Sequence, residues 1–271
     1  MDLSHFRVFG FVVLQQFFDA SPIGAEIDRL LPSEAGTSVN TPGAGEIRFQ
    51  YVPMMTAETP ASLALLARTQ PLAERLFDGP VLPTRAKGTR YWGDTPWHAD
   101  SGLPLASIGI LAYLEPLRAE TGSLRVIPGS HRPEFGDGLR SLGVSGKPAA
   151  GMPSHAIATD PGDLIVFDER LFHASSGGGV RRQWRVDYVA DPADADAEDQ
   201  TRAYFRGLFR SDWDGGYDVD RHPSHGEGWR RSASAIASRL EALGVLEMAA
   251  RQEAFMRSRR LAEINPRGST R

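Results

Sequence analysis

A histidine and an aspartate stand two positions apart in the hexapeptide TPWHAD, as His98 and Asp100. In an extended segment, residues i and i+2 point to the same side, so both side chains can bind one ion from one strand. A later histidine, His173, completes a set of two imidazoles and one carboxylate, which suits a non-haem Fe(II) centre. Three protein ligands leave the opposite face of an octahedral metal open. The sequence therefore predicts a half-open metal site that could accept a co-substrate and oxygen.

The composition excludes several other chemistries. The chain has no cysteine, which rules out disulfides, thiolate zinc sites, iron–sulfur clusters and cysteine nucleophiles. A formal net charge of −4 argues against nucleic-acid or membrane-surface partners. We see no signal peptide and no run near the roughly 18 apolar residues that span a bilayer. We therefore expect a cytoplasmic protein that acts on a small molecule.

The first 80 residues read mainly as helices that must support this site. Residues 10–15 form a β-branched, apolar run that predicts a buried strand. Apolar residues at near-helical spacing predict a helix over 17–31, and the Gly-, Pro-, Ser- and Thr-rich segment 33–46 is expected to be a loop. A second helix should begin at Pro60, with Thr59 as its N-cap, and end near Phe77.

Between residues 81 and 190 the pattern changes to short strands separated by Gly and Pro turns, which is typical of an antiparallel sandwich or barrel. The three candidate metal ligands all lie in this part. After Asp191 the pattern is helical again, with a long helix or helix pair over 232–261. We expect one domain over 1–271, made of a helical part (1–80), a β core (81–190) and C-terminal helices (191–271). The expected strands are 81–82, 89–92, 108–114, 124–127, 163–167 and 183–190.

Three motifs in one order give the chain a specific resemblance. They are TPWHAD at 95–100, GSLRVIPGSH at 122–131 and LFHAS at 171–175. With these motifs the chain resembles the phytanoyl-CoA dioxygenase (PhyH-like) family of Fe(II)- and 2-oxoglutarate-dependent oxygenases, from the first strand to about residue 190. The resemblance implies a mostly β fold with flanking helices, built on a double-stranded β-helix (jelly-roll, cupin-like) core.

The resemblance also implies roles for individual residues. His98, Asp100 and His173 match the iron ligands of the family, and 2-oxoglutarate and O2 would use the open face of the metal. The distal carboxylate of 2-oxoglutarate needs a permanent cation, and the planar fork of an arginine matches it. Ser175 matches a family position that hydrogen-bonds the co-substrate carboxylate; a plain loop serine is the alternative.

Three arginines, Arg181, Arg182 and Arg185, compete for the co-substrate. In an extended segment Arg182 shares a face with three apolar residues, whereas Arg181 and Arg185 share the other, more polar face. We expect the apolar face to point into the barrel, which favours Arg182 as the 2-oxoglutarate ligand. A one-residue bulge would exchange it for Arg181.

The carboxylate of Asp100 bears on the reaction. Related halogenases have a small residue at this position, so that chloride can bind the metal. With Asp100 present, we expect hydroxylation of an unactivated C–H bond, with release of succinate and CO2. Desaturation or cyclisation with the same cofactors, a non-oxygenase cupin-like metal enzyme, and a non-catalytic binding protein remain the alternatives.

The substrate is less defined by the sequence. Tyr91, Trp97 and Arg90 flank the metal motif and are candidates for the pocket wall. Arg85, Lys87 and Arg90 form a basic cluster that could receive a carboxylate or phosphonate; a solvated rim is the alternative. An amino acid or a natural product would fit equally well.

Two further histidines, His222 and His225, lie in a loop rich in Pro, Gly and Ser. They are candidates for a second metal site, against the simpler interpretation of a solvated loop. His131, in the Pro-Gly-Ser-His turn, is expected to shape the rim without binding metal.

Overall fold

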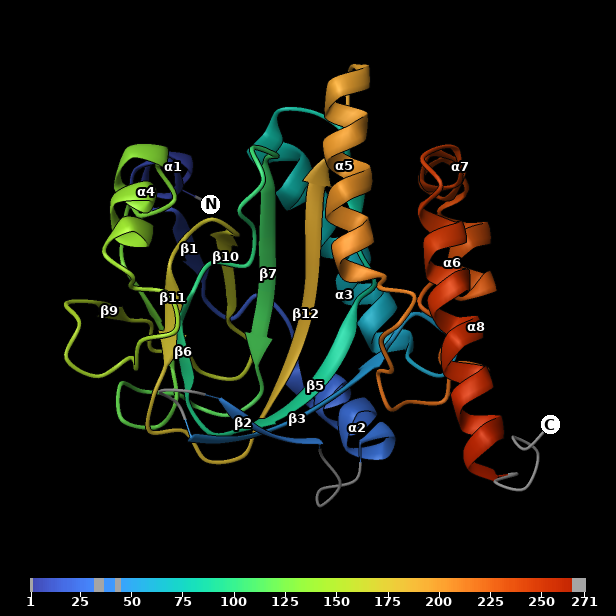
Figure 1. The fold of residues 1–271 in the computed structure, drawn as a ribbon, viewed down its shortest axis with the longest axis horizontal. Coiled ribbons are helices and arrows are strands. Elements are labelled where there is room, and N and C mark those ends of the chain that lie inside the picture. The colour runs from blue at the N-terminus through green and yellow to red at the C-terminus, as the bar shows by residue number, and fades with distance from the viewer. Residues whose placement is uncertain (1, 32–36, 42–44, 265–271) are drawn as a thin grey trace.

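A computed structural model describes residues 2–31, 37–41 and 45–264 of the chain. Two antiparallel sheets face each other, and helices cover the outside of the larger sheet (Figure 1). The larger sheet has the strand order β1-β10-β7-β12-β5-β3-β2, with β4 paired to β12, and the smaller has the order β6-β11-β8-β9. This is the arrangement of a jelly roll, in which the space between the sheets can form a binding cavity.

The bounds of the elements are as follows. The strands are β1 (Phe11–Leu14), β2 (Thr37–Thr41), β3 (Gly45–Pro53), β4 (Val81–Pro83), β5 (Lys87–Trp92), β6 (Thr95–His98), β7 (Ser107–Tyr113), β8 (Leu124–Val126), β9 (His155–Ala156), β10 (Leu164–Asp168), β11 (His173–Ser175) and β12 (Arg181–Ala190). The helices are α1 (Leu3–Phe9), α2 (Ala20–Leu30), α3 (Pro60–Phe77), α4 (Pro133–Ser141), α5 (Ala195–Leu208), α6 (Glu227–Ser232), α7 (Ser234–Ala242) and α8 (Val245–Ile264).

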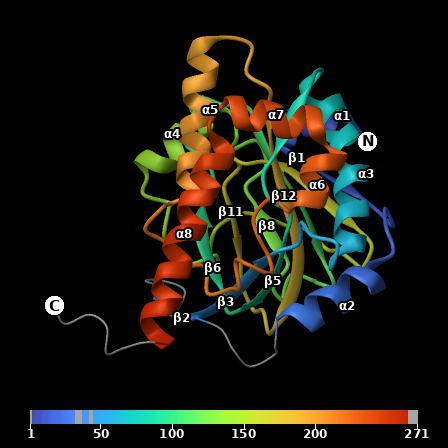
Figure 2. The same cartoon turned by 90° about the vertical axis from the view of Figure 1, so that its right-hand side faces the viewer.

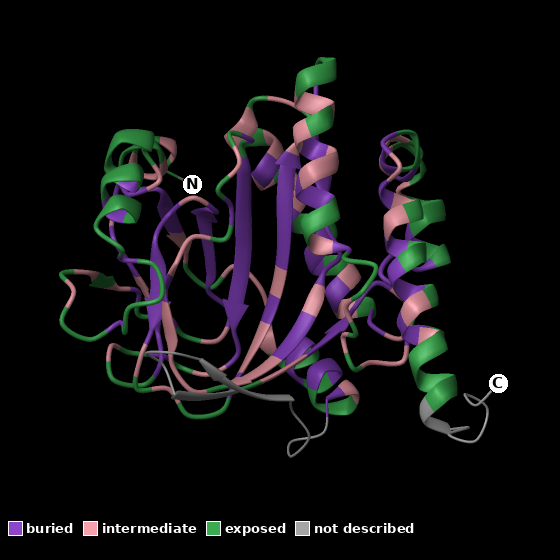
Figure 3. Ribbon diagram, in the orientation of Figure 1, coloured by how far each residue is buried: buried purple, intermediate pink, exposed green. Residues whose placement is uncertain are grey.

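Strand β12 is the centre of the larger sheet. It pairs with β5 and β7 along its two edges and with β4 near its end. Trp184, Val186 and Tyr188 share the face that meets α2 and α3 and are fully buried there. Figure 3 colours most of this strand as buried. The indole Nε1 of Trp184 donates a hydrogen bond to Ser62 Oγ of α3 at 2.8 Å, and the Tyr188 hydroxyl lies 2.9 Å from Thr69 Oγ1. These contacts fix the helix layer on the sheet.

The start of α3 is capped by another helix. Pro60 occupies the first turn, as the sequence predicts, but the Thr59 side chain makes no capping hydrogen bond. Instead the carboxylate of Glu26, on α2, accepts hydrogen bonds from the backbone N–H groups of Ala61 at 2.7 Å and Ser62 at 3.1 Å. A negative charge at these unpaired N–H groups stabilises a helix N-terminus. The buried Glu26 therefore joins α2 to α3 beneath the sheet.

The predicted strands and long helices are confirmed, with one correction. The loop expected over 33–46 is wrong where the chain is described, because residues 37–41 and 45–53 pair as β2 and β3; residues 32–36 and 42–44 lie outside the described part. The expected fold class is confirmed, although the term mostly β is loose, because the described helices contain more residues than the described strands. Much of the difference comes from the C-terminal helices.

The C-terminal helices form a group of their own. Figure 2 shows α6, α7 and α8 together on one side of the sheets, next to α5, and contacts link α5 to α8 and α6 to α7. None of the helices in the described part of the chain combines the length and apolar character that crossing a membrane requires.

Candidate metal centre and cofactor cavity

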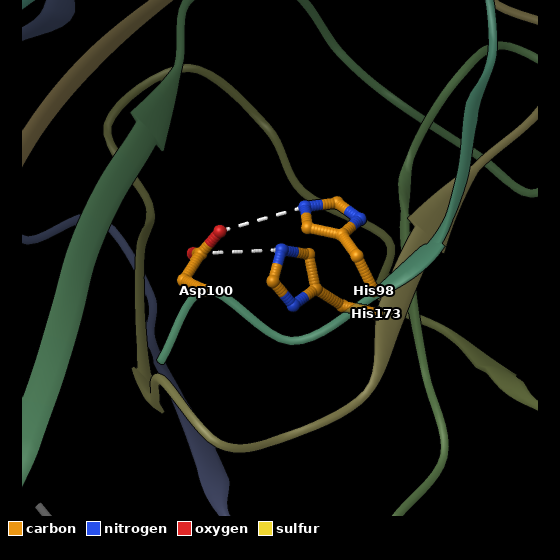
Figure 4. A group of neighbouring side chains, drawn as sticks. All are labelled: His98, Asp100 and His173. Atoms are coloured by element: carbon orange, nitrogen blue, oxygen red, sulfur yellow. Dashed lines mark ion pairs between the residues drawn. The ribbon is translucent and has the colours of Figure 1, made fainter. Parts of the chain in front are cut away.

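Strands β6 and β11 bring the two predicted histidines together. They pair antiparallel with His173 directly opposite His98, and the centres of the two imidazole rings lie 4.1 Å apart. Asp100 follows β6 by two residues and turns its carboxylate toward both rings (Figure 4). One potential ligand atom from each residue lies within 4.8 Å of the other two. Residues 75 positions apart in the chain thus meet because two short strands are neighbours.

Each imidazole is oriented by the backbone carbonyl two residues before it in the chain. His98 Nδ1 lies 2.8 Å from the carbonyl oxygen of Pro96, and His173 Nδ1 lies 2.9 Å from that of Leu171. A carbonyl only accepts, so each Nδ1 carries the proton and each Nε2 keeps its lone pair. The Nε2 atoms lie 3.4 Å and 3.6 Å from the oxygens of Asp100. Two neutral nitrogens and a carboxylate therefore converge, and this donor set fits Fe(II).

The charges of the three groups also suit a divalent metal. Burial, together with the neighbouring His98, lowers the pKa of His173 to about 4, so this ring is neutral at physiological pH. Burial also opposes the charged form of His98, but the hydrogen bond and charge of Asp100 outweigh it and raise the pKa. Burial likewise opposes ionisation of Asp100, yet Arg185 and the two histidines hold its pKa well below the usual value. A metal ion would displace the proton that His98 can hold.

Arg185 orients Asp100. The sequence indicates it only as one of three candidate ligands for 2-oxoglutarate. Its guanidinium donates to Asp100 Oδ2 at 2.8 Å, to Glu169 Oε1 at 3.2 Å and to Asp187 Oδ1 at 2.5 Å. The backbone N–H of Asp100 donates to the Glu169 carbonyl at 2.8 Å. Burial, and next the charge of Asp187, raise the pKa of Glu169 to about 8. Asp100 is thus held through both its carboxylate and its backbone.

A cavity of about 310 Å³ opens beside the three residues, between the two sheets. Its volume falls in the range of small-molecule sites. Strand β12 contributes its inward side chains to it, and β5, β7 and β11 supply much of the rest. Besides the three clustered residues, the polar lining comprises Thr89, Tyr91, Thr95, Tyr113, Ser175, Arg181, Gln183 and Arg185.

Arg181 is the buried cation of this cavity. Only 3% of the residue is exposed, and its Nη2 donates to Ser175 Oγ at 2.8 Å and to the Gly93 carbonyl at 2.9 Å. The guanidinium carbon lies 4.5 Å from the centre of the Tyr91 ring, which supports it by a cation–π contact. Among the described residues no carboxylate forms an ion pair with Arg181. Its charge is therefore available to an anion in the cavity.

Arg182 lies on the opposite face of β12, so the expected orientation of this strand is wrong. Its Nε donates to Glu115 Oε1 at 2.6 Å, and its Nη1 to Asp28 Oδ2 at 2.6 Å. The apolar face of the strand packs under α2 and α3 outside the barrel, instead of lining the interior. The residues of each face are grouped as expected. The apolar face is nevertheless the outer one, because α2 and α3 cover it, and the polar face is the inner one.

Of the three residues predicted to form the pocket wall, one lines the cavity and two do not. Tyr91 lines the cavity, and its hydroxyl lies 2.8 Å from Thr95 Oγ1. Trp97 does not line it, because the residue is 0% exposed and packs in a separate apolar cluster with Phe172. Arg90 points outward and pairs with Asp28 at 2.7 Å. Trp97 lies within the motif and Arg90 shortly before it. Each side chain is on the face of its strand that points away from the cavity.

The candidate second metal site, at His222 and His225, does not assemble. Within the described ranges, the only group of three His, Asp or Glu residues close enough to share an ion is His98, Asp100 and His173. His225 is buried beside aromatic rings, and burial, with the nearby charge of Arg85, lowers its pKa to about 3. A cation such as Arg85 next to the ring disfavours a metal ion there.

The jelly roll and the clustered donors define the class of non-haem metal enzymes built on a double-stranded β-helix. Residues 6–183 match the phytanoyl-CoA dioxygenase (PhyH) family, and the chain belongs to it. It is therefore an iron- and 2-oxoglutarate-dependent dioxygenase, and iron, 2-oxoglutarate and O2 are its cofactors. The resemblance noted in the sequence is confirmed.

Solved structures support the fold. AviO1 from Streptomyces viridochromogenes Tue57 is 22% identical, with a TM-score of 0.54 over 71% of this chain and 95% of that one. The non-heme alpha ketoglutarate dependent epimerase SnoN from nogalamycin biosynthesis is 21% identical (TM-score 0.55; 70% and 81% covered). HygX from Streptomyces hygroscopicus, with nickel and 2-oxoglutarate bound, is 19% identical (TM-score 0.55; 72% and 92% covered). No curated protein matches the sequence.

Proposed function

We propose that the protein hydroxylates an unactivated C–H bond of a small molecule, with His98, Asp100 and His173 as its iron ligands. The observation that carries this proposal is the convergence of two Nε2 lone pairs and one carboxylate at the edge of the cavity between the sheets. When bound, iron couples the oxidative decarboxylation of 2-oxoglutarate to succinate and CO2 with oxidation of the substrate. The protein supplies orientation and excludes water.

Arg181 binds the distal carboxylate of 2-oxoglutarate in this proposal, and Ser175 assists it. Three observations support Arg181 over Arg182: its guanidinium lines the same cavity as the candidate iron ligands, it is buried, and no carboxylate of the described chain pairs with it. Ser175 Oγ accepts from Arg181 at 2.8 Å and donates to Thr95 Oγ1 at 3.1 Å, so it keeps the guanidinium in place. A planar guanidinium and a carboxylate can then form paired hydrogen bonds.

The choice of hydroxylation over halogenation rests on Asp100. Its carboxylate points at both imidazoles and is fixed by Arg185, so it is ready to be the third protein ligand. If the three protein ligands, bidentate 2-oxoglutarate and O2 all bind the metal, no position would be left for a halide. Arg185 acts as a positioning residue, since it donates to Asp100 Oδ2 and is not itself one of the three metal donors.

Anaerobic titration with Fe(II) and 2-oxoglutarate tests the proposal. The wild-type protein should develop the weak visible charge-transfer band of the iron chelate, and His173→Ala and Asp100→Ala should not. His155→Ala is the matched control, because His155 is an exposed histidine outside the cavity. In air, succinate release across a panel of amino acids and natural products should identify the substrate, and the mass of its product should increase by one oxygen. A wild-type protein without the band, or an unchanged band in both ligand variants, would reject the assignment.

A further inference from the structure

A second cavity, of about 330 Å³, lies on the other side of Asp100. It shares Asp100 and Arg185 with the cofactor cavity, so a molecule bound there would lie next to the candidate metal centre. Its walls come from the start of β5, from residues 101–103 after Asp100, and from α5. The cofactor cavity is lined by Arg181, which suits 2-oxoglutarate, whereas the second cavity is lined by Lys87 and by residues of α5. The two compartments therefore suit two different ligands.

Helix α5 gives this cavity its particular shape. The helix lies beyond residues 6–183, the part that matches the family, so its wall belongs to this chain's own C-terminal segment. Tyr204 of α5 donates its hydroxyl hydrogen to Glu169 Oε2 at 2.8 Å, which attaches the helix to the network behind Asp100. At Gly207 an added Cβ would meet no atom within 4 Å. A small residue on α5 thus leaves the cavity accessible from outside.

Lys87 is the cation of this cavity with the fewest hydrogen bonds. It forms a long ion pair with Asp187 Oδ2 at 3.8 Å, and its Nζ makes no hydrogen bond to any described residue. Arg185, the other cation, already donates to three carboxylates. The side chain of Lys87 is only 21% exposed, and a largely buried ammonium gains from a partner that accepts its hydrogen bonds. An anionic group in the cavity would be such a partner.

The three residues of the basic cluster noted in the sequence lie in different surroundings, and this difference again points to Lys87. Arg90 pairs with Asp28 on the outer face, and Arg85 is buried between the Tyr51 and Phe209 rings. Only Lys87 of the three reaches the cavity. The lining also includes the apolar side chains of Leu103 and Leu208. Three carboxylates line the cavity as well, and all three accept hydrogen bonds from Arg185.

We propose that this second cavity binds the primary substrate, and that the substrate is a small molecule with a carboxylate or similar monoanionic group held by Lys87. Its apolar part would rest on Leu103 and Leu208, and its reacting carbon would point past Asp100 to the metal. The inference rests on the proposed oxygenase function for the chemistry, but its electrostatic basis can be tested without metal.

The absence of cysteine makes a direct test straightforward. Gly207→Cys places a single thiol at the cavity, and Gly228→Cys, on α6, is the matched control because an added Cβ there also meets nothing within 4 Å. Each metal-free protein is treated with the sulfonatoethyl and the trimethylammonioethyl methanethiosulfonate. The two reagents carry opposite charges, and each transfers its thioethyl group to the thiol by the same disulfide-forming reaction, with methanesulfinate as the leaving group. The sulfonate-to-ammonium rate ratio should be at least about threefold higher at Gly207→Cys. Lys87→Met in that background should remove the excess.

Equal ratios at the two cysteines, or an excess that persists with Lys87→Met, would overturn the inference. Circular dichroism identifies a variant that fails to fold, and Lys87→Gln then replaces Lys87→Met. Once a carboxylate substrate is found, Lys87→Met should raise its KM about tenfold, as expected for a lost hydrogen bond to a charged group. Because the thiol assay needs neither iron nor 2-oxoglutarate, its failure is distinct from loss of the chelate band, which tests the proposed function.

Discussion

The two faces of β12 carry adjacent arginines in opposite situations. Arg181 faces the cavity without a carboxylate partner among the described residues, whereas Arg182 faces α2 and is held by Glu115 and Asp28. The inner face continues with Gln183, Arg185 and Asp187, and the outer face with Trp184, Val186 and Tyr188. In this fold the apolar side of a central strand belongs to the sheet–helix interface, and the polar side belongs to the cofactor. The role of each arginine is therefore decided by the groups around it, since both carry the same charge.

The largest expected effect comes from the outer face. Trp184→Ala removes a fully buried indole and its hydrogen bond to Ser62, so the free energy of unfolding should fall by about 3–5 kcal/mol. Urea denaturation followed by circular dichroism measures this. Trp92→Ala, at a half-exposed position, should change it by about 0.5 kcal/mol or less. A loss below about 1 kcal/mol at Trp184 would contradict the proposed role of the outer face.

On the inner face, Arg185→Met should have a comparable effect with a different signature. It leaves Asp100 and Asp187 without their shared cation, and breaking such a buried ionic network costs about 3 kcal/mol or more. Because Asp100 also loses its orientation, Fe(II) affinity should fall about 10- to 100-fold. Anaerobic Fe(II) titration at saturating 2-oxoglutarate reads out the second effect. Stability lost with iron affinity unchanged would mean that Arg185 only supports the core.

The neighbouring arginines give the sharpest contrast. Arg181→Met should weaken 2-oxoglutarate binding about 100-fold, since a buried charged partner contributes about 2–5 kcal/mol to binding. Arg182→Met should leave that affinity within about twofold and lower stability by about 1 kcal/mol or less, as for an exposed ion pair. Titrating 2-oxoglutarate against the Fe(II) protein distinguishes them. The reverse result would restore Arg182 as the ligand.

The smallest effect is expected at Ser175. Ser175→Ala removes one acceptor from Arg181 and one donor to Thr95, so 2-oxoglutarate affinity should fall about three- to tenfold, near 1 kcal/mol. The same titration measures it, with Ser176→Ala as a neighbouring control. No change at Ser175 would indicate that the Gly93 and Gly179 carbonyls and the Tyr91 ring are sufficient to hold the guanidinium.

Much of the candidate site could be predicted from the sequence because its signals are local. His98 and Asp100 share a spacing of two that any extended segment turns to one side. His173 follows a strongly apolar strand, and the order of the three motifs is specific to one family. The fold followed from the same family resemblance and from strands with clear turns between them.

The features that the sequence could not predict depend on distant partners. Which face of β12 is inside is decided by α2 and α3, which lie more than a hundred residues earlier in the chain. The capping of α3 by Glu26 and the contact of Arg185 with Asp100 likewise join remote segments. The β2–β3 pairing arises in a segment rich in turn formers, where tertiary pairing outweighs local preference.

Both histidines are oriented in the same way: each Nδ1 donates a hydrogen bond to the backbone carbonyl two residues earlier in the chain. Neither ring has to rotate when an ion arrives, so the binding geometry costs little conformational entropy and is present in the folded apoprotein. A pocket prepared in this way does not select ferrous iron, because nickel, copper and zinc bind nitrogen and oxygen donors more tightly than Fe(II). The metal content of the purified protein should accordingly follow the supply during expression, and chelation followed by anaerobic reloading with Fe(II) should bring all preparations to the same specific activity.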